Sequence, residues 1–149
     1  LRSLQLAMMY HFTFGDLAEG RLAASELRAA LRESSPGQAL IALLVNLSEA
    51  ARLDGDFETA IDLLHRAHSI AARLTASYAT ARTAGKLATR AVELGDPQGA
   101  AAWLHEAEHH AERCESAEVR LELANTRSQV LLMQGFAIDA CFEAQRNLN

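Results

Sequence analysis

The chain has 149 residues, half of them apolar and 5% aromatic, and its formal net charge at pH 7 is -5. Its longest apolar run, Ala39–Val45, is too short to cross a bilayer, and no stretch has the pattern of a secretion signal. Lysine and arginine form no cluster of the kind that duplex nucleic acids require. We therefore expect no membrane insertion and no direct nucleic-acid contact by this segment.

The abundance of alanine and leucine favours helices, which the sequence arranges in pairs. In chain order, the first helix of each pair is predicted over Leu1–Phe14, Gly37–Asp54, Ser77–Leu94 and Ala117–Gln134. The second helix of each pair is predicted to begin just after Gly15, Gly55, Gly95 or Gly135. Further breaks are expected near Ser35, Thr75 and Ser116. The chain is thus expected to be all-α, with eight helices and no strand.

The four glycines are forty residues apart, and other positions keep this period, such as Ala60, Ala100 and Ala140. Each glycine can end a helix in the left-handed conformation, and an aspartate after it, as at Asp56 and Asp96, can cap the next helix. We interpret the chain as one repeat domain over 1–149, excerpted from a longer chain. The repeats are expected at about 1–36, 37–76, 77–116 and 117–149.

Gly55-Asp56-Phe57, followed by Ala60, Leu64 and Ala67, resembles the turn and second helix of the tetratricopeptide repeat family. The glycine usual in that family's first helices is replaced by Ser48 and Ala88. The resemblance implies a right-handed α-solenoid of four antiparallel helix pairs. The long period is similar to that of bacterial transcription regulators of the maltose-operon activator type. It implies a cytoplasmic, non-catalytic module that binds a protein or senses an effector for such a regulator; the alternative is a free-standing adaptor.

The letters HEAEH, from His105 to His109, match a zinc-hydrolase motif in which Glu106 would activate the bound water. The repeat places this segment in a second helix, whose buried face includes Leu104 and Ala107, so both histidines should point outward. No third protein ligand follows in the expected spacing. We expect no enzyme, no catalytic residue and no cofactor. Two alternatives stay open: a zinc-dependent hydrolase and a weak surface metal site formed by His105, His109 and Glu112.

The first helices of tetratricopeptide arrays line the concave, partner-binding side. We expect a ligand-binding groove on this concave side. The residues predicted to line it are Asn46, Glu49, Arg82, Lys86, Thr89, Glu122, Asn125 and Gln129. Asn46, Arg82 and Lys86 occupy places similar to those of the carboxylate clamp in co-chaperones of this family. The resemblance implies a protein or peptide partner, or a small acidic effector. Alternatively, Arg82 and Lys86 simply pair with Glu49, Glu93 or Glu122.

The two ends of the chain are unusually apolar for terminal repeats. The first helix contains LQLAMMYHFTF, and the last presents Ile138, Cys141 and Phe142 on differing faces. We expect these ends to pack on further repeats, on other domains or on a second copy of the chain. Packing on a second copy would be self-association through the terminal helices. Cys114 and Cys141 follow no metal or disulfide spacing and are expected to be free thiols in a reducing cytoplasm.

Overall fold

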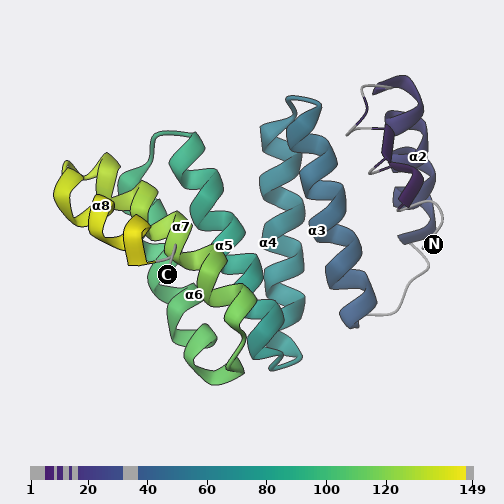
Figure 1. Ribbon diagram of the computed structural model, residues 1–149. Helices are drawn as coiled ribbons and strands as arrows, with labels where there is room; N and C mark the ends of the chain where they lie inside the picture. Colours follow the sequence, from purple (N-terminus) through teal and green to yellow (C-terminus); the bar gives the residue numbers. More distant parts are fainter. Residues whose placement is uncertain (1–5, 9, 12–13, 15–16, 32–36, 147–149) are drawn as a thin grey trace. The chain divides into compact units, whose positions relative to one another are not determined.

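The computed structural model describes residues 6–8, 10–11, 14, 17–31 and 37–146, and this part of the chain contains helices and no strand (Figure 1). The helices are α2 (Leu17–Leu31), α3 (Gln38–Leu53), α4 (Phe57–Arg73), α5 (Ser77–Glu93), α6 (Pro97–Cys114), α7 (Ala117–Met133) and α8 (Ala137–Arg146). The chain forms two compact units, Leu1–Ile70 and Ala71–Asn149. The all-α prediction is confirmed.

The breaks between the described helices fall where the sequence predicts them, near Gly55, Thr75, Gly95, Ser116 and Gly135. The breaks at Gly15 and Ser35, the cap Asp16 and most of the first helix, predicted over Leu1–Phe14, lie outside the described residues. The predicted antiparallel pairing is visible in α5 and α6, which contact each other along their lengths.

Local chemistry explains the breaks between the paired helices. Gly55, Gly95 and Gly135 have φ angles of 82°, 73° and 86°, in the left-handed region that favours glycine. After two of these glycines, an aspartate caps the next helix, because Asp56 accepts a hydrogen bond from Thr59 N at 3.1 Å and Asp96 accepts one from Gly99 N at 2.9 Å. These interactions end one helix and begin the next within a few residues.

In the first unit, α2 contacts α3. Arg21 on α2 donates from Nε to both carboxylate oxygens of Asp54, at 2.8 and 3.0 Å, just after α3 ends. The hydrogen bond to Asp54 and the attraction of its charge raise the pKa of Arg21 above the ordinary value. The buried side chains of this unit include Leu27, Leu44, Leu47 and Leu64. As in the second unit, alanines such as Ala60 and Ala67 are buried beside these leucines, so the core mixes small and larger apolar side chains.

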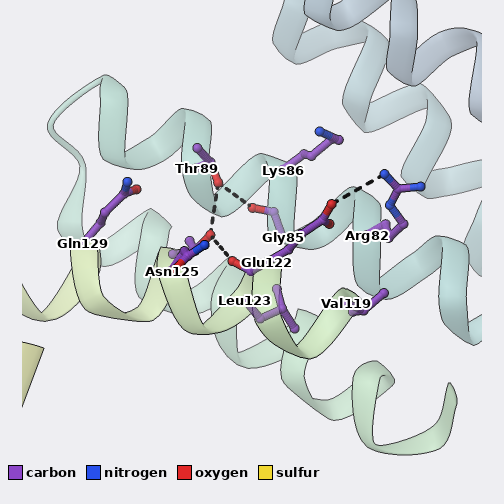
Figure 2. A pocket seen from close by; sticks show the side chains of 10 residues that line it. Arg82, Gly85, Lys86, Thr89, Val119, Glu122, Leu123, Asn125 and Gln129 are labelled. Atoms are coloured by element: carbon purple, nitrogen blue, oxygen red, sulfur yellow. Dashed lines mark hydrogen bonds and ion pairs between the residues drawn. The ribbon is translucent and has the colours of Figure 1, made fainter. Parts of the chain in front are cut away.

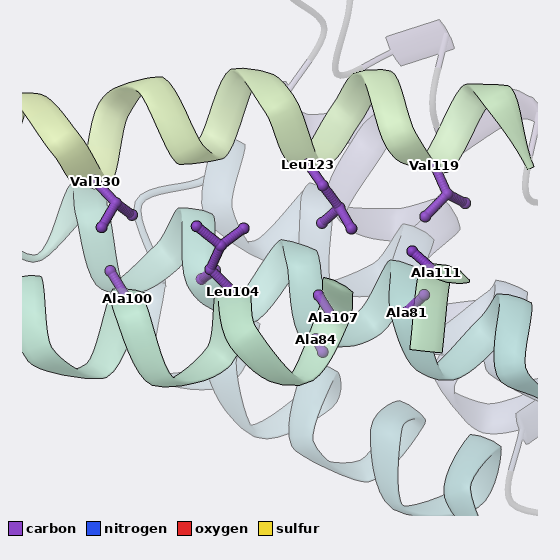
Figure 3. Packing of buried hydrophobic residues seen from close by; sticks show 10 residues of the cluster. Ala81, Ala84, Ala100, Leu104, Ala107, Ala111, Val119, Leu123 and Val130 are labelled. Atoms are coloured by element: carbon purple, nitrogen blue, oxygen red, sulfur yellow. The ribbon is translucent and has the colours of Figure 1, made fainter. Parts of the chain in front are cut away.

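In the second unit, α7 packs against α5 and α6, and α8 packs against α7. The core between these helices combines alanines with a few larger aliphatic residues (Figure 3). Ala100 and Ala107 on α6 are fully buried, and Leu104 lies between them on the same face. Val119, Leu123 and Val130 point toward this face from α7. The small side chains let the helix backbones approach closely, while the larger ones fill the remaining space.

Arg127 joins three helices of the second unit. From α7, its Nε donates to Glu108 on α6 at 2.8 Å, and Nη1 lies 3.5 Å from Glu143 on α8. Burial alone would lower the pKa of Arg127, but the hydrogen bond to Glu108 and the attraction of both carboxylates outweigh it, so the pKa is raised. The guanidinium therefore stays charged and helps to hold α6, α7 and α8 together.

None of the described helices combines the length and the apolar character needed to cross a membrane. The longest continuous apolar run of the chain, Ala39–Val45 in α3, is far shorter than a bilayer requires.

Candidate functional site

A groove lies between α5 and α7, with a cavity volume of ≈ 250 Å³ (Figure 2). Its lining residues are Arg82, Gly85, Lys86, Thr89, Val119, Glu122, Leu123, Asn125, Thr126 and Gln129. On each helix, every one of these residues has another lining residue three or four positions away, so they share one face of the helix. We refer to this hollow as the α5–α7 groove.

The α5–α7 groove brings together six of the eight residues predicted from the sequence: Arg82, Lys86, Thr89, Glu122, Asn125 and Gln129. The other two, Asn46 and Glu49, lie on α3 in the first compact unit. Glu49 accepts a hydrogen bond from Arg52 Nε at 2.9 Å. The periodicity within α5 and α7 therefore identified part of the lining of this groove.

Gly85 sets how closely the two walls of the groove approach. A Cβ atom added to Gly85 would lie 2.7 Å from Leu123 Cδ2, which is closer than van der Waals contact allows. Glycine at this position lets the Leu123 side chain of α7 pack directly against α5. Gly85, Val119, Leu123 and Thr126 were not among the residues predicted from the sequence, although Gly85 shares a helix face with Arg82 and Thr89 by spacing alone.

Arg82 is held by contacts within the protein at one end of the groove. Its guanidinium carbon lies 5.7 Å from the centre of the Tyr78 ring, and Nη2 lies 3.6 Å from Glu122 Oε1. Tyr78 in turn donates from its hydroxyl to Glu118 at 3.2 Å. Because Arg82 is 34% exposed and Glu122 is 44% exposed, solvent screens this ion pair and its contribution to stability is small.

Lys86 differs from Arg82, because no described residue pairs with its ammonium group. Glu93, which the sequence also offered as a partner, pairs instead with Arg90. The groove therefore has two cations and one carboxylate, and that carboxylate is already bound to Arg82. A positive charge is thus left in the groove of a chain whose net charge is -5.

Two hydroxyl groups face each other across the groove. Thr89 Oγ1 and Thr126 Oγ1 are 3.2 Å apart, and each also lies within hydrogen-bond distance of a carbonyl in its own helix, at Gly85 and Glu122. Two hydroxyl protons cannot fill three hydrogen bonds at once, so the pair can rearrange when a ligand offers a donor or an acceptor. Asn125 and Gln129 add side-chain amides on the same wall, as Figure 2 shows.

A larger cavity of ≈ 500 Å³ lies among α6, α7 and α8. Its charged lining consists of three glutamates and three arginines: Glu108, Glu112, Glu143, Arg120, Arg127 and Arg146. Most of these charges pair with one another, through Arg127 in particular. Because opposite charges balance there, the α5–α7 groove is the better candidate for binding a charged ligand.

His105 and His109, from the zinc-hydrolase motif, are exposed on α6, as is Glu112. His109 makes an edge contact with the ring of His110, with 5.5 Å between the ring centres. Across the described residues, no three His, Cys, Asp or Glu side chains converge in a way that could hold a metal ion. The motif therefore has no set of three ligands in this part of the structure.

A family model of the tetratricopeptide repeat matches residues 39–113. The matched segment includes nearly all of α3 and all of α4 and α5, and it ends in the last turn of α6. No curated protein is a significant match to the chain.

Proposed function

Because this chain belongs to the tetratricopeptide repeat family, we propose that it is a non-catalytic module that binds a protein or peptide in the α5–α7 groove. Repeats of this family bind proteins or peptides, and arrays of stacked helix pairs use their concave faces for this purpose. The groove has lining groups from two neighbouring first helices of the repeats. That convergence is the observation that carries the proposal.

The ligand that this groove suits best carries a carboxylate. Lys86 is a cation without a partner among the described residues, and the amides of Asn125 and Gln129 lie nearby on α7. A carboxylate bound to Lys86 would form a charge-assisted hydrogen bond, and the amides and hydroxyls could bind polar groups beside it. The ligand would be an acidic peptide segment or a small acidic effector. Added salt should weaken its binding, since the groove is open to solvent.

A pair of peptides tests this proposal. One alternates glycine and glutamate over six residues, and the other has glutamine in place of each glutamate. We expect the glutamate peptide to shift the NMR signals of the Asn125 and Gln129 side-chain amides, with smaller shifts at high salt. The glutamine peptide should cause little change. Equal shifts with both peptides, or shifts elsewhere only, would contradict the assignment.

Charge reversal provides the matched mutational test. Arg82→Glu with Lys86→Glu should abolish binding of the glutamate peptide, because a carboxylate would then meet like charges. Lys86→Glu alone should weaken it at least ~10-fold, the effect of about 1.4 kcal/mol. The control is Arg73→Glu with Arg113→Glu, which changes the net charge equally at exposed positions of α4 and α6. The control should retain binding; equal loss in both double variants would implicate net charge alone.

The wider role that we propose is effector or partner sensing within a bacterial transcription regulator in the cytoplasm. The forty-residue period supports this proposal through its similarity to regulators of the maltose-operon activator type. The alternative is a free-standing adaptor that holds a protein complex together. A DNA-binding or ATPase domain encoded in the same polypeptide would favour the regulator, and a coding sequence with neither would favour the adaptor.

A further inference from the structure

Helix α8 presents an apolar stripe to solvent. Ile138, Cys141, Phe142 and Gln145 share one face at intervals of three and four residues, and they line a hollow of ≈ 350 Å³. Ile138 is 74% exposed and Phe142 is 62% exposed, whereas Ala140, on nearly the opposite side of the helix, is 3% exposed. We refer to these four residues as the α8 stripe.

The α8 stripe is not a feature of the repeat. One period earlier, the corresponding positions of α6 are Gln98, Ala101, Ala102 and His105. In α4 they are Glu58, Ile61, Asp62 and His65. At these positions α6 has only alanine and polar residues, whereas α4 has one bulky apolar residue, Ile61, and α2 has one, Leu22. Among the described second helices, two bulky apolar residues occur together at these positions only in α8. Exposed apolar stripes of this kind mark contact surfaces.

We propose that the α8 stripe binds the same stripe of a second copy of this chain, with the two α8 helices antiparallel. Charge complementarity favours a second copy over other partners for this surface. Asp139 and Arg146 lie on the same side of the stripe, ~100° from its centre around the helix. A two-fold axis that crosses the helix near Phe142 is equally distant from both, so it places Asp139 of each copy opposite Arg146 of the other.

Both charges are available for such a contact. Asp139 has no partner among the described residues. Arg146 lies 3.3 Å from Glu143 of the same helix, but its side chain is 77% exposed, so this pair is weak and easily rearranged. In the centre of the interface, Phe142 of each copy would pack against Phe142 of the other, close to the two-fold axis. Two ten-residue helices bury less than a standard interface, so we expect a weak dimer, populated at about 100 µM and above.

Sedimentation equilibrium of the 149-residue chain, over about a hundredfold range of concentration, tests the proposal. We expect a monomer–dimer equilibrium that Phe142→Asp weakens at least ~10-fold. The matched control is Leu121→Asp, because Leu121 is 51% exposed on α7 and lies outside the stripe. The control variant should dimerise as the unchanged chain does. Circular dichroism should confirm that both variants are folded.

A charge swap tests the antiparallel geometry directly. Asp139→Arg and Arg146→Asp should each weaken the dimer, because each places like charges opposite one another. The double variant, with both changes, should restore it. In a Cys114→Ser background, a short bismaleimide should also link the exposed Cys141 of one copy to that of the other.

A strict monomer at all concentrations would overturn the proposal, and the stripe would then be left to a further segment of a longer chain or to a different protein. A dimer that is insensitive to Phe142→Asp would overturn it as well, since another face would then form the contact. If Asp139→Arg combined with Arg146→Asp does not restore dimerisation, the antiparallel arrangement is excluded.

Discussion

At the scale of single residues, the turns at the ends of the helices depend on one left-handed position each. Thr75 has φ 52°, although a β-branched residue is strained in this region. Its N–H donates to Ala72 O and the next N–H donates to Ala71 O, which is the same pattern that Gly55 makes after α3. Thr75 therefore occupies a position that glycine would fill with less strain.

We expect Thr75→Gly to raise the free energy of unfolding by up to about 1 kcal/mol. Relief of the left-handed strain, roughly 1–2 kcal/mol, exceeds the extra entropy that glycine gives the unfolded chain. The matched reverse change is Gly95→Ala at φ 73°, which should lower the free energy of unfolding by ~1–2 kcal/mol. Urea unfolding measures both, and a loss of stability in Thr75→Gly would show that its side chain makes a compensating contact.

At the scale of the helix, the packing of the second unit depends on alanines at the contact between helices. Ala100 is fully buried on α6, and Figure 3 places it near Val130 of α7. Only two positions along the same helix, Ala102 is exposed. The two residues have the same side chain in different surroundings, so they form a matched pair for testing how tightly the helices pack.

Ala100→Leu should lower the free energy of unfolding by ~1–3 kcal/mol, because the larger side chain forces the packed helices apart. Ala102→Leu should change it by less than ~0.5 kcal/mol, as is usual for surface positions. Thermal or urea unfolding of the two variants measures the difference in their free energies of unfolding. Similar stability for both would mean that α6 does not pack closely at Ala100.

At the scale of the whole molecule, fold and function are expected to be independent of metal. His105 and His109 are exposed, and no third ligand joins them in the described part of the chain. A chelator should therefore leave the melting temperature unchanged, and so should His105→Ala combined with His109→Ala. Metal analysis of the purified protein completes this test. A stoichiometric zinc ion that is lost from the double variant together with hydrolytic activity would reverse the conclusion.

The sequence by itself determined the helices, their breaks and the residues that share a helix face. These features depend on local chemistry. Gly55 ends its helix because it adopts the left-handed conformation, which requires no tertiary contact. Arg82, Lys86 and Thr89 share a face because of the helical period alone. The prediction of one domain over 1–149, with its repeat boundaries, stays a prediction. The same is true of a ligand in the groove.

Tertiary structure alone decided which charges are paired and how closely the groove walls approach. From the sequence, Glu49, Glu93 and Glu122 were all possible partners for Arg82 and Lys86. In the structure Arg82 forms an ion pair with Glu122, and no described residue pairs with Lys86. Gly85 likewise proved important only because Leu123 of α7 lies against it. Such contacts join residues about forty positions apart on different helices. Their distances depend on how the helices pack, which the period along one helix does not specify.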